Sequence, residues 1–552
     1  MTMDRSTGEH SAFVNGRVLT MEPELGTAEA VSTVHGVVDA VGSTDEIKRR
    51  IGPDTEVVDL DGRTVVPGFV DAHQHPLGYG FAQAGIWVDC SDVTSIDDLV
   101  AKGEARAAET PDGEWVYGRG WPVARLERLP RKEDFAGRVD ANPVWFNDLS
   151  GHLWILNQPA LDAIGLDADT PEPDRGIIDR AADGEPTGVL RDCTPFEVGD
   201  LSSPFGDSDV RPGLEAAVDR LVEFGITTFG QIGIRIKPDG YGTERVRPWI
   251  EMDREGELKA RVRLMLEPYR RLHESGEFDH LAALADLGVL TGFGTDRVKL
   301  GPLKIIADGW QDSRSGYMKE PYASAPSERG YLKRADADDY RRMIEVATEA
   351  GLQVAIHADG DASAEVVLDA YESVREEMPE RFDDLRHRFE HARILTDEQV
   401  ERIADLGIHV NAAPVNYSRE PWYYEMLARN VGPEREHRLL RHKTLWEEGV
   451  RISGGSDLHP GIDRWMSPIS ALHFLVNEGP EDERFTPSEA LRMYTINGAY
   501  SYHAEDEIGS IAPGKAADMV VLSADPTTVP TGDIDGVTVE RTIVGGETVY
   551  GA

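Results

Sequence analysis

The chain has 552 residues, 40% of them hydrophobic, and its 57 basic and 100 acidic residues give a formal net charge of -43. This acidic excess disfavours nucleic acid and anionic membranes as partners, and no apolar run reaches the ~18 residues of a membrane-spanning helix. The first ten residues lack the apolar core of a secretory signal, and the two cysteines, Cys90 and Cys193, make no disulfide framework. We therefore expect a cytoplasmic protein.

The acidic residues are spread along the whole chain rather than gathered in a block. This distribution disfavours an acidic interaction tail. At high ionic strength the self-repulsion of such a surface is screened. We interpret the composition as that of a halophilic protein, a hypothesis that predicts loss of structure or activity in low salt.

Short alternating strands are expected at both ends of the chain. At the N-terminal end they cover 12–21, 31–41 and 56–60, and in the first of them Asn15-Gly16 suits a two-residue hairpin turn. At the C-terminal end they cover 518–522 and 537–550. Neither end has enough strands for a stable sheet of its own. We therefore predict a composite β-sandwich built from residues 1–63 and 506–552, in preference to two separate terminal hairpins.

Between the two ends, apolar runs alternate with helical patterns, which is typical of βα units around a parallel sheet. The predicted strands are 64–70, 225–230, 261–266, 298–306, 353–357, 386–390, 408–412 and 450–454, with helices at 211–224, 336–350, 397–406 and 438–448 among them. Eight such strands predict an α/β protein with a (β/α)8 TIM barrel over residues 64–505. That span exceeds the ~250 residues of a plain barrel, so we interpret 81–200 as a subdomain inserted after the first barrel strand.

Two histidines follow the first barrel strand, in the stretch VVPGFVDAHQH at 65–75. In an extended chain alternate side chains share a face, so His73 and His75 point the same way. Two imidazoles on one face can hold one metal ion. The alternative is that each histidine only makes a hydrogen bond within a loop.

Four further ionisable residues fall at the C-terminal ends of predicted strands, where TIM-barrel active sites are built. They are Lys304, His357, His391 and Asp457. An Asp after Gly-Gly-Ser often only caps a helix, and a His that ends a strand is often structural. Lys304 is more informative, because an isolated ammonium is costly to bury within an apolar run. Beside metal ions, a desolvated lysine loses its proton more easily and could take up carbon dioxide as a carbamate.

Ten stretches of the chain carry a family resemblance: VVPGFVDAHQH, PVWFNDLSGHLWILNQPAL, GEPTGVLRD, GITTF, VKLGPLKIIADG, IHADGDASA, RHRFEHARI, SGGSD, YTINGAY and GSIAPGKAADMVVL. Together they resemble the amidohydrolase superfamily and, within it, the amidohydrolase-3 or YtcJ-like branch. The resemblance implies a metal-bearing barrel on a composite β-sandwich. It assigns metal ligation to His73, His75, His357, His391 and Asp457, with Lys304 as the carbamylated bridge. One or two divalent ions are expected, and zinc suits these ligands.

The chemistry expected from this resemblance is hydrolysis of an amide-like, non-peptide C–N bond in a small molecule. N-substituted formamides and cyclic amides are examples from related enzymes. A metal-activated hydroxide would attack the carbonyl carbon, and Asp457 would take the proton of the water and pass it to the leaving nitrogen. Hydrolysis of an ester or C–halogen bond is an alternative, and so is a catalytically silent binding protein. A homodimer is compatible with the sequence, as is a monomer.

Four residues are candidates for contact with the substrate. His152, in the stretch SGHLW, is expected to reach the pocket from the insertion and orient the substrate, with a structural role inside the subdomain as the alternative. Trp121 could line the same pocket. Trp310 and Arg314 could select the substrate.

Overall fold

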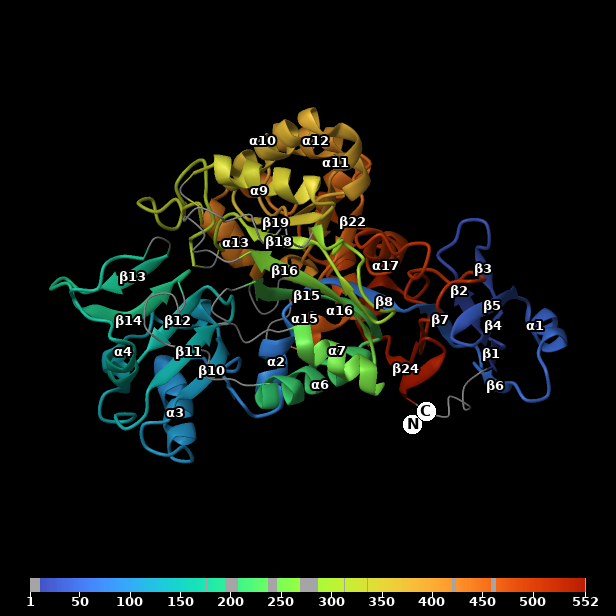
Figure 1. The fold of residues 1–552 in the computed structure, drawn as a ribbon, viewed down its shortest axis with the longest axis horizontal. Coiled ribbons are helices and arrows are strands. Elements are labelled where there is room, and N and C mark those ends of the chain that lie inside the picture. The colour runs from blue at the N-terminus through green and yellow to red at the C-terminus, as the bar shows by residue number, and fades with distance from the viewer. Residues whose placement is uncertain are drawn as a thin grey trace.

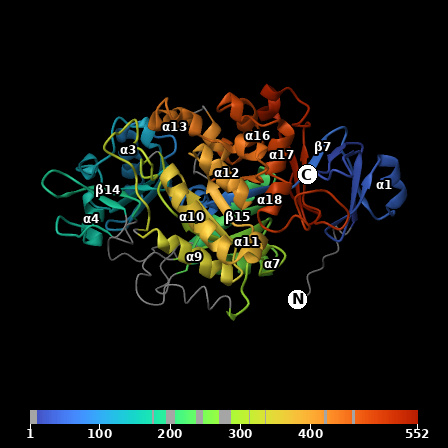
Figure 2. The same ribbon diagram turned by 90° about the horizontal axis from the view of Figure 1, so that it is seen from above.

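The structure is a computed structural model that describes residues 10–173, 176–193, 207–236, 246–268, 286–311, 313–334, 336–418, 423–457 and 463–551. Within these ranges no helix has both the length and the apolar character needed to cross a membrane. Figures 1 and 2 show three groups of elements in a row. N-terminal strands and their C-terminal partners lie at one end, parallel strands with their helices lie in the middle, and a separate sheet lies at the other end.

Strands from the two ends of the chain form two sheets with a shared core. One sheet has the order β5-β4-β1-β6 and the other β25-β24-β23-β7-β2-β3. The strands are β1 His10–Val14, β2 Arg17–Leu19, β3 Thr27–Ala28, β4 Ala30–Val34, β5 Val37–Gly42, β6 Glu56–Asp59, β7 Thr64–Pro67, β23 Met519–Leu522, β24 Val539–Val544 and β25 Glu547–Tyr550. The C-terminal β23 pairs antiparallel with β7. Phe13, Val31, Val65 and Val521 belong to one buried apolar cluster.

The predicted hairpin at 12–21 is wrong. β1 pairs with β4 and β6, whereas β2 pairs with β3 and β7, so the chain passes from one sheet to the other between them. Asn15 does adopt the expected left-handed conformation, with φ 58°. Close packing explains Gly16, because a Cβ there would lie 2.3 Å from the Leu60 side chain. The chain therefore bends at Asn15-Gly16, as the sequence predicted, but the bend connects strands of two different sheets instead of two strands of one hairpin.

Among the described residues, the middle of the chain has nine parallel strands in two sheets, β17-β16-β15-β8 and β18-β19-β20-β21-β22. Their bounds are β8 Phe69–Gln74, β15 Ile226–Ile236, β16 Arg261–Pro268, β17 Val298–Leu300, β18 Leu303–Ile306, β19 Val354–Ala358, β20 Arg388–His391, β21 His409–Ala412 and β22 Ile452–Gly454. β18 and β22, the two edge strands of the second sheet, contact β16 and β8 of the first sheet. Within each sheet the strands are parallel, so their C-terminal ends lie at the same side of that sheet.

Two of the predicted barrel strands are divided in the structure. The predicted strand 64–70 breaks at Gly68 into β7, which joins the terminal sheet, and β8, which joins the parallel one. A Cβ at Gly68 would lie 2.1 Å from Thr227 Oγ1, so the close approach requires glycine there. The predicted strand 298–306 likewise divides into β17 and β18.

Helices follow most of the parallel strands. Those of the middle group and the C-terminal region are α2 Pro76–Gln83, α6 Asp207–Glu223, α7 Val246–Glu255, α9 Asp338–Glu349, α10 Asp361–Glu377, α11 Pro379–Leu385, α12 Asp397–Leu406, α13 Tyr423–Val431, α14 His442–Glu447, α15 Asp463–Met466, α16 Pro468–Asn477, α17 Pro487–Met493 and α18 Ile496–Tyr500. Helix α12 has the predicted bounds, because Thr396 and Gln399 form a capping box at its start and Gly407 ends it at φ 65°. Figure 2 shows α9, α10, α11 and α12 grouped along one side of the middle region. α1 (Thr44–Arg50) belongs to the terminal sheets.

Residues after α2 form a sheet of their own, with the order β13-β14-β12-β11-β10-β9. Its elements are β9 Val88–Asp89, α3 Ile96–Ala107, β10 Val116–Trp121, β11 Val144–Asp148, β12 Leu153–Leu156, α4 Gln158–Ile164, β13 Ile177–Arg180 and β14 Pro186–Arg191. Two apolar clusters lie against it, one including Phe135 and Phe146 and the other Leu161 and Leu190. Figure 1 shows this sheet beside the parallel strands, at the end far from the terminal sheets.

Candidate metal centre

Several predicted ligands converge at the C-terminal ends of the parallel strands. His73 lies in β8 and His75 directly after it, while Asp457 lies three residues beyond β22. Asp457 Oδ1 is 3.5 Å from His73 Nε2 and 3.6 Å from His75 Nε2. His391, the last residue of β20, places Nδ1 3.9 Å from Asp457 Oδ2. The ring centroid of His357, in β19, is 4.7 Å from that of His391. The structure thus brings the five together.

The spacing of these donor atoms fits a shared metal ion better than direct hydrogen bonds. Hydrogen bonds between nitrogen and oxygen are normally ~2.7–3.2 Å long, and the two separations from Asp457 Oδ1 exceed that range. Ligand atoms ~2.0–2.2 Å from a tetrahedral zinc ion are separated by about 3.4 Å. One donor atom each from His73, His75 and Asp457 all lie within 4.8 Å of one another. Imidazole and carboxylate donors also suit zinc.

Glu390 holds His73 in the orientation that a metal ligand needs. His73 Nδ1 contacts Glu390 Oε2, and Glu390 also accepts from Arg388 at 2.7 and 3.0 Å. Burial alone would raise the pKa of Glu390, but Arg388 and His73 outweigh burial and hold that pKa below its usual range. The carboxylate is therefore ionised and can only accept. His73 donates from Nδ1, which leaves its Nε2 lone pair facing Asp457.

A backbone carbonyl fixes the tautomer of His357 in a similar way. His357 Nε2 is 3.0 Å from the carbonyl oxygen of Gly309. Because a carbonyl oxygen can only accept, Nε2 carries the proton and Nδ1 keeps the lone pair that could bind a metal. Burial lowers the pKa of His75 and of His391 well below 6.5, which keeps both imidazoles neutral, as ligation requires.

Lys304 lies in β18, 2% exposed, beside the same groups. Burial lowers its pKa to about 8, although the nearby Glu390 and Asp457 carboxylates act to raise it. Burial is also the main cause that lowers the pKa of His73, and the charge of Lys304 adds to that effect. An amine whose pKa is near 8 is uncharged in part of its population at neutral pH and can act as a nucleophile.

Asp457 and Asp71 are held at the base of the centre by backbone groups. Asp457 adopts φ 49°, and its N–H donates to the carbonyl oxygen of His73 at 2.8 Å. The buried Asp71 accepts from the N–H groups of Ser456 at 3.0 Å and His73 at 3.2 Å. Burial raises the pKa of Asp71 to about 7. The sequence analysis did not identify Asp71 or Glu390. Each lies two positions from another buried polar residue on the same strand, His73 for Asp71 and Arg388 for Glu390, which is a weak indication that the two side chains point to the same face.

Two of the four candidate substrate contacts lie against the histidines. The ring of His152 stacks on Trp310 with centroids 6.0 Å apart, and lies 6.2 Å from the ring of His357. The ring of Trp310 is 5.7 Å from that of His391. Arg393 packs over the indole, with its guanidinium carbon 3.8 Å from the ring centroid.

The other two candidates are placed differently. Trp121 is fully buried in an apolar cluster of the inserted sheet, and its indole N–H donates to the Phe146 carbonyl at 3.3 Å. This position does not favour contact with a substrate. Arg314 donates from Nε to Glu328 at 2.9 Å. That ion pair would have to break before the guanidinium could bind a substrate.

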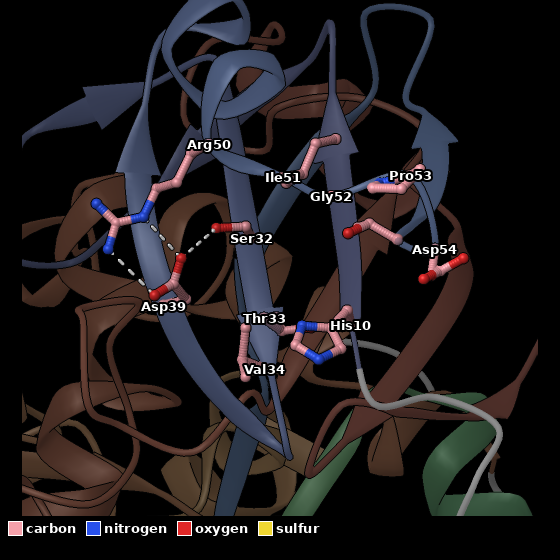
Figure 3. Close-up of a pocket in the computed structure, with 11 residues that line it drawn as sticks. His10, Ser32, Thr33, Val34, Asp39, Arg50, Ile51, Gly52, Pro53 and Asp54 are labelled. Carbon is pink, nitrogen blue, oxygen red and sulfur yellow. Dashed lines mark hydrogen bonds and ion pairs between the residues drawn. The ribbon is translucent and has the colours of Figure 1, made fainter.

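A cavity of about 400 Å³ lies elsewhere, on the sheet that contains β1, β4 and β5. Figure 3 shows Arg50 paired with Asp39, which also accepts from Ser32, and His10 on the opposite wall. The cavity shares no residue with the cluster of histidines. We therefore assign the candidate site to the parallel strands and not to this cavity.

Parallel strands that carry histidines and a carboxylate at their C-terminal ends are the arrangement of a metal-dependent hydrolase. The chain belongs to the amidohydrolase family, whose model matches residues 56–550. It is similar to YtcJ of Bacillus subtilis (strain 168), with 30% identity over 97% of this chain and 98% of the relative. It is also similar to an N-substituted formamide deformylase of Arthrobacter pascens, with 29% identity over 98% of each chain. Among solved structures, an uncharacterized metal-dependent hydrolase from Pyrococcus furiosus has a TM-score of 0.71 and 26% identity, over 94% of this chain and all of that one.

Proposed function

We propose that the protein is a metal-dependent amidohydrolase that cleaves an amide-like, non-peptide C–N bond in a small molecule. The observation that carries this proposal is the convergence of His73, His75 and Asp457, whose donor atoms have the mutual spacing of ligands to one ion. The family membership agrees with it. One relative is named for action on N-substituted formamides, so we take that class as the first substrates to test.

In this proposal His73, His75, His357, His391 and Asp457 hold one or two divalent ions, with zinc expected and carbamylated Lys304 as the bridge. When bound, such ions supply an acidified water and polarise a carbonyl oxygen. Asp457 accepts the proton of the attacking water and passes it to the leaving nitrogen. Glu390 and Gly309 keep His73 and His357 in the tautomers that ligation needs.

We also propose an architecture for the whole chain. The nine parallel strands form a TIM barrel over residues 64–505, in which β17 and β18 together make one barrel strand. Residues 1–63 and 506–552 make the composite β-sandwich, and residues 81–200 make the inserted subdomain. The edge contacts from β16 to β18 and from β22 to β8 support barrel closure. We propose a cytoplasmic enzyme that is a monomer or a homodimer and functions at a high intracellular salt concentration.

The test combines metal analysis with a substrate screen on protein purified in high salt. N-substituted formamides, hydantoins and N-acyl amino acids are supplied as substrates, with an ester and a haloalkane as alternatives. We expect about one or two equivalents of metal and turnover in one of the amide classes. Turnover of the ester or haloalkane alone would show that the enzyme hydrolyses an ester or C–halogen bond instead of a C–N bond. Metal content near zero would favour a catalytically silent binding protein.

A variant of Asp457 tests the proposed proton transfer. Asp457→Asn should abolish turnover while most of the metal stays bound, because the amide oxygen can still ligate but the amide cannot accept the proton. Asp482→Asn, at an exposed position, is the matched control and should behave as wild type. Turnover retained by Asp457→Asn would remove Asp457 as the base.

A further inference from the structure

An arginine near the start of β16 is buried without a carboxylate partner. Arg263 is 2% exposed, and it forms no ion pair with any described residue. Its Nη1 donates to the carbonyl of the preceding residue, Val262, at 3.3 Å. Neither Nε nor Nη2 of Arg263 makes a hydrogen bond within the part of the chain that the structure describes. Because buried polar groups are normally hydrogen-bonded, these two donors point to a further acceptor.

The two donors lie on the edge of the guanidinium that other buried arginines of this protein use to bind a carboxylate. Arg261 donates from Nε and Nη2 to Asp518 at 2.7 and 3.1 Å. Arg388 donates from the same two atoms to Glu390 at 2.7 and 3.0 Å. The N–H groups on this edge point in parallel directions, so the edge suits an anion that accepts from both of them. Arg263 therefore presents a buried anion-binding edge to which no described carboxylate is bound.

The side chain of Arg263 points into the space between the two parallel sheets. Side chains two positions apart on a strand share a face, so Arg263 and Met265 point the same way. Met265 forms an apolar cluster with Ile232 of β15 and Ala355 of β19. Because β15 and β19 belong to different sheets, this cluster lies between the sheets. Arg263 is thus enclosed by strands rather than directed toward the helices.

The packing around Arg263 favours a small, monatomic anion. Gly230 of β15 is the residue paired with Arg263 on the neighbouring strand. A Cβ at Gly230 would clash with the hydroxyl of Tyr502, so that side chain fills the inner face next to Arg263. Toward β17, a Cβ at Gly301 would lie 3.4 Å from Arg263 Cβ. In such close packing a halide ion is easier to accommodate than a phosphate, a sulfate or an organic acid.

The guanidinium of Arg263 keeps its charge without a partner of its own. Burial lowers its pKa to about 10, and the charge of Arg261 adds to that effect, so Arg263 is still cationic at pH 7. Glu507 and Asp296 act to raise this pKa. However, these two carboxylates are paired with Lys299 and Arg261. An unpaired buried charge is costly, because it gives up its hydration without gaining a counterion.

We propose that Arg263 holds a buried chloride ion, which accepts from its Nε–H and Nη2–H. The ion would lie apart from the candidate metal centre, because Arg263 is the third residue of β16 whereas Asp457 lies beyond the C-terminal end of β22. The inference does not depend on the proposed function. A ligand that binds only the folded state stabilises that state according to the ligand concentration. The stability of the fold would therefore depend on chloride itself and not only on ionic strength.

The first test follows the melting temperature of the full-length protein while sodium chloride replaces sodium gluconate at constant ionic strength. We expect the wild-type melting temperature to rise with chloride and then saturate, by roughly 1–3 °C. Arg263→Met removes the charge and all the donors at similar side-chain length, and should lose this rise. Arg254→Met, at an exposed position of α7, is the matched control and should keep it. Chloride bound at the metal centre would affect all three proteins alike.

The second test uses crystals of the wild-type protein grown with bromide as the halide, and it needs no variant. Bromide scatters anomalously, and we expect an anomalous peak within hydrogen-bond distance of both Nε and Nη2 of Arg263. If Arg263→Met does not fold, this crystallographic result alone decides. The inference would be overturned by crystals without a peak at this edge, or by a folded Arg263→Met whose response to chloride equals that of wild type.

Discussion

Replacing Glu390 by Gln tests how the candidate metal centre is held together. Gln keeps the size of Glu and one oxygen that can accept from His73, but it removes the charge that faces Arg388. Both side chains of that ion pair are fully buried. Removing one partner of a buried ion pair costs about 3–5 kcal/mol, and losing a carboxylate that orients a ligating imidazole lowers metal affinity about 10–100-fold. We therefore expect Glu390→Gln to melt at a lower temperature and to bind metal more weakly.

The assay is a competition titration of the metal against a chromophoric chelator, alongside a thermal melt of the metal-free protein. Glu481→Gln, at an exposed position, is the matched control and should match wild type in both measurements. A second variant, Arg388→Met with Glu390→Gln, removes the unbalanced charge and should regain stability while metal affinity stays low. Wild-type metal affinity in Glu390→Gln would refute the argument that this carboxylate orients His73.

Three further predictions concern the whole fold. Burial lowers the pKa of His387 to about 3, and its Nδ1 accepts from the Val354 N–H at 3.0 Å. Below pH 6.5 the imidazole of His387 is protonated in the unfolded state but stays neutral in the folded state. The free energy of unfolding should therefore fall as the pH drops, by about 1.4 kcal/mol at pH 5.5. Melting curves of His387→Asn should show a smaller loss between pH 7.5 and 5.5, and an equal loss would refute this. Gly68→Ala would place Cβ 2.1 Å from Thr227 Oγ1 and should destabilise the fold by at least ~1–3 kcal/mol, whereas Gly52→Ala, which meets no atom within 4 Å, should not. Finally, with a net charge of -43, the melting temperature should fall as salt is dialysed away; unchanged melting in low salt would contradict the halophilic interpretation.

The sequence predicts much of the middle of the chain, because the pattern there is local. Each predicted parallel strand overlaps an observed one. Helix α12 has the predicted bounds because the residues that cap it, Thr396 and Gln399 at its start and Gly407 at its end, can be recognised in the sequence. The sequence did not indicate where strands change sheet. The Asn15-Gly16 signal describes a turn, but it carries no information about which sheet the next strand joins.

For the candidate site, the sequence indicated the strand-end residues but not the groups that orient them. His73, His75 and Asp457 do lie together, as expected from strand ends that share one side; their role as ligands stays a prediction. Glu390 contacts His73, which is 317 positions away in the sequence, and Asp192 contacts His152, which is 40 positions away. Neither carboxylate has a local pattern that reveals its partner. Trp121 shows the opposite problem, since nothing in its sequence neighbourhood distinguishes a core tryptophan from one that lines a pocket.

The break at Gly68 has a consequence for how the protein is made. β7 pairs with β2 on one side and with the C-terminal β23 on the other, and β8, with His73, begins two residues after β7 ends. During synthesis, more than four hundred further residues must therefore be added after β7 before its second neighbour, β23, leaves the ribosome. We expect the nascent chain to keep this strand edge open, and the imidazoles next to it unanchored, until synthesis is nearly complete.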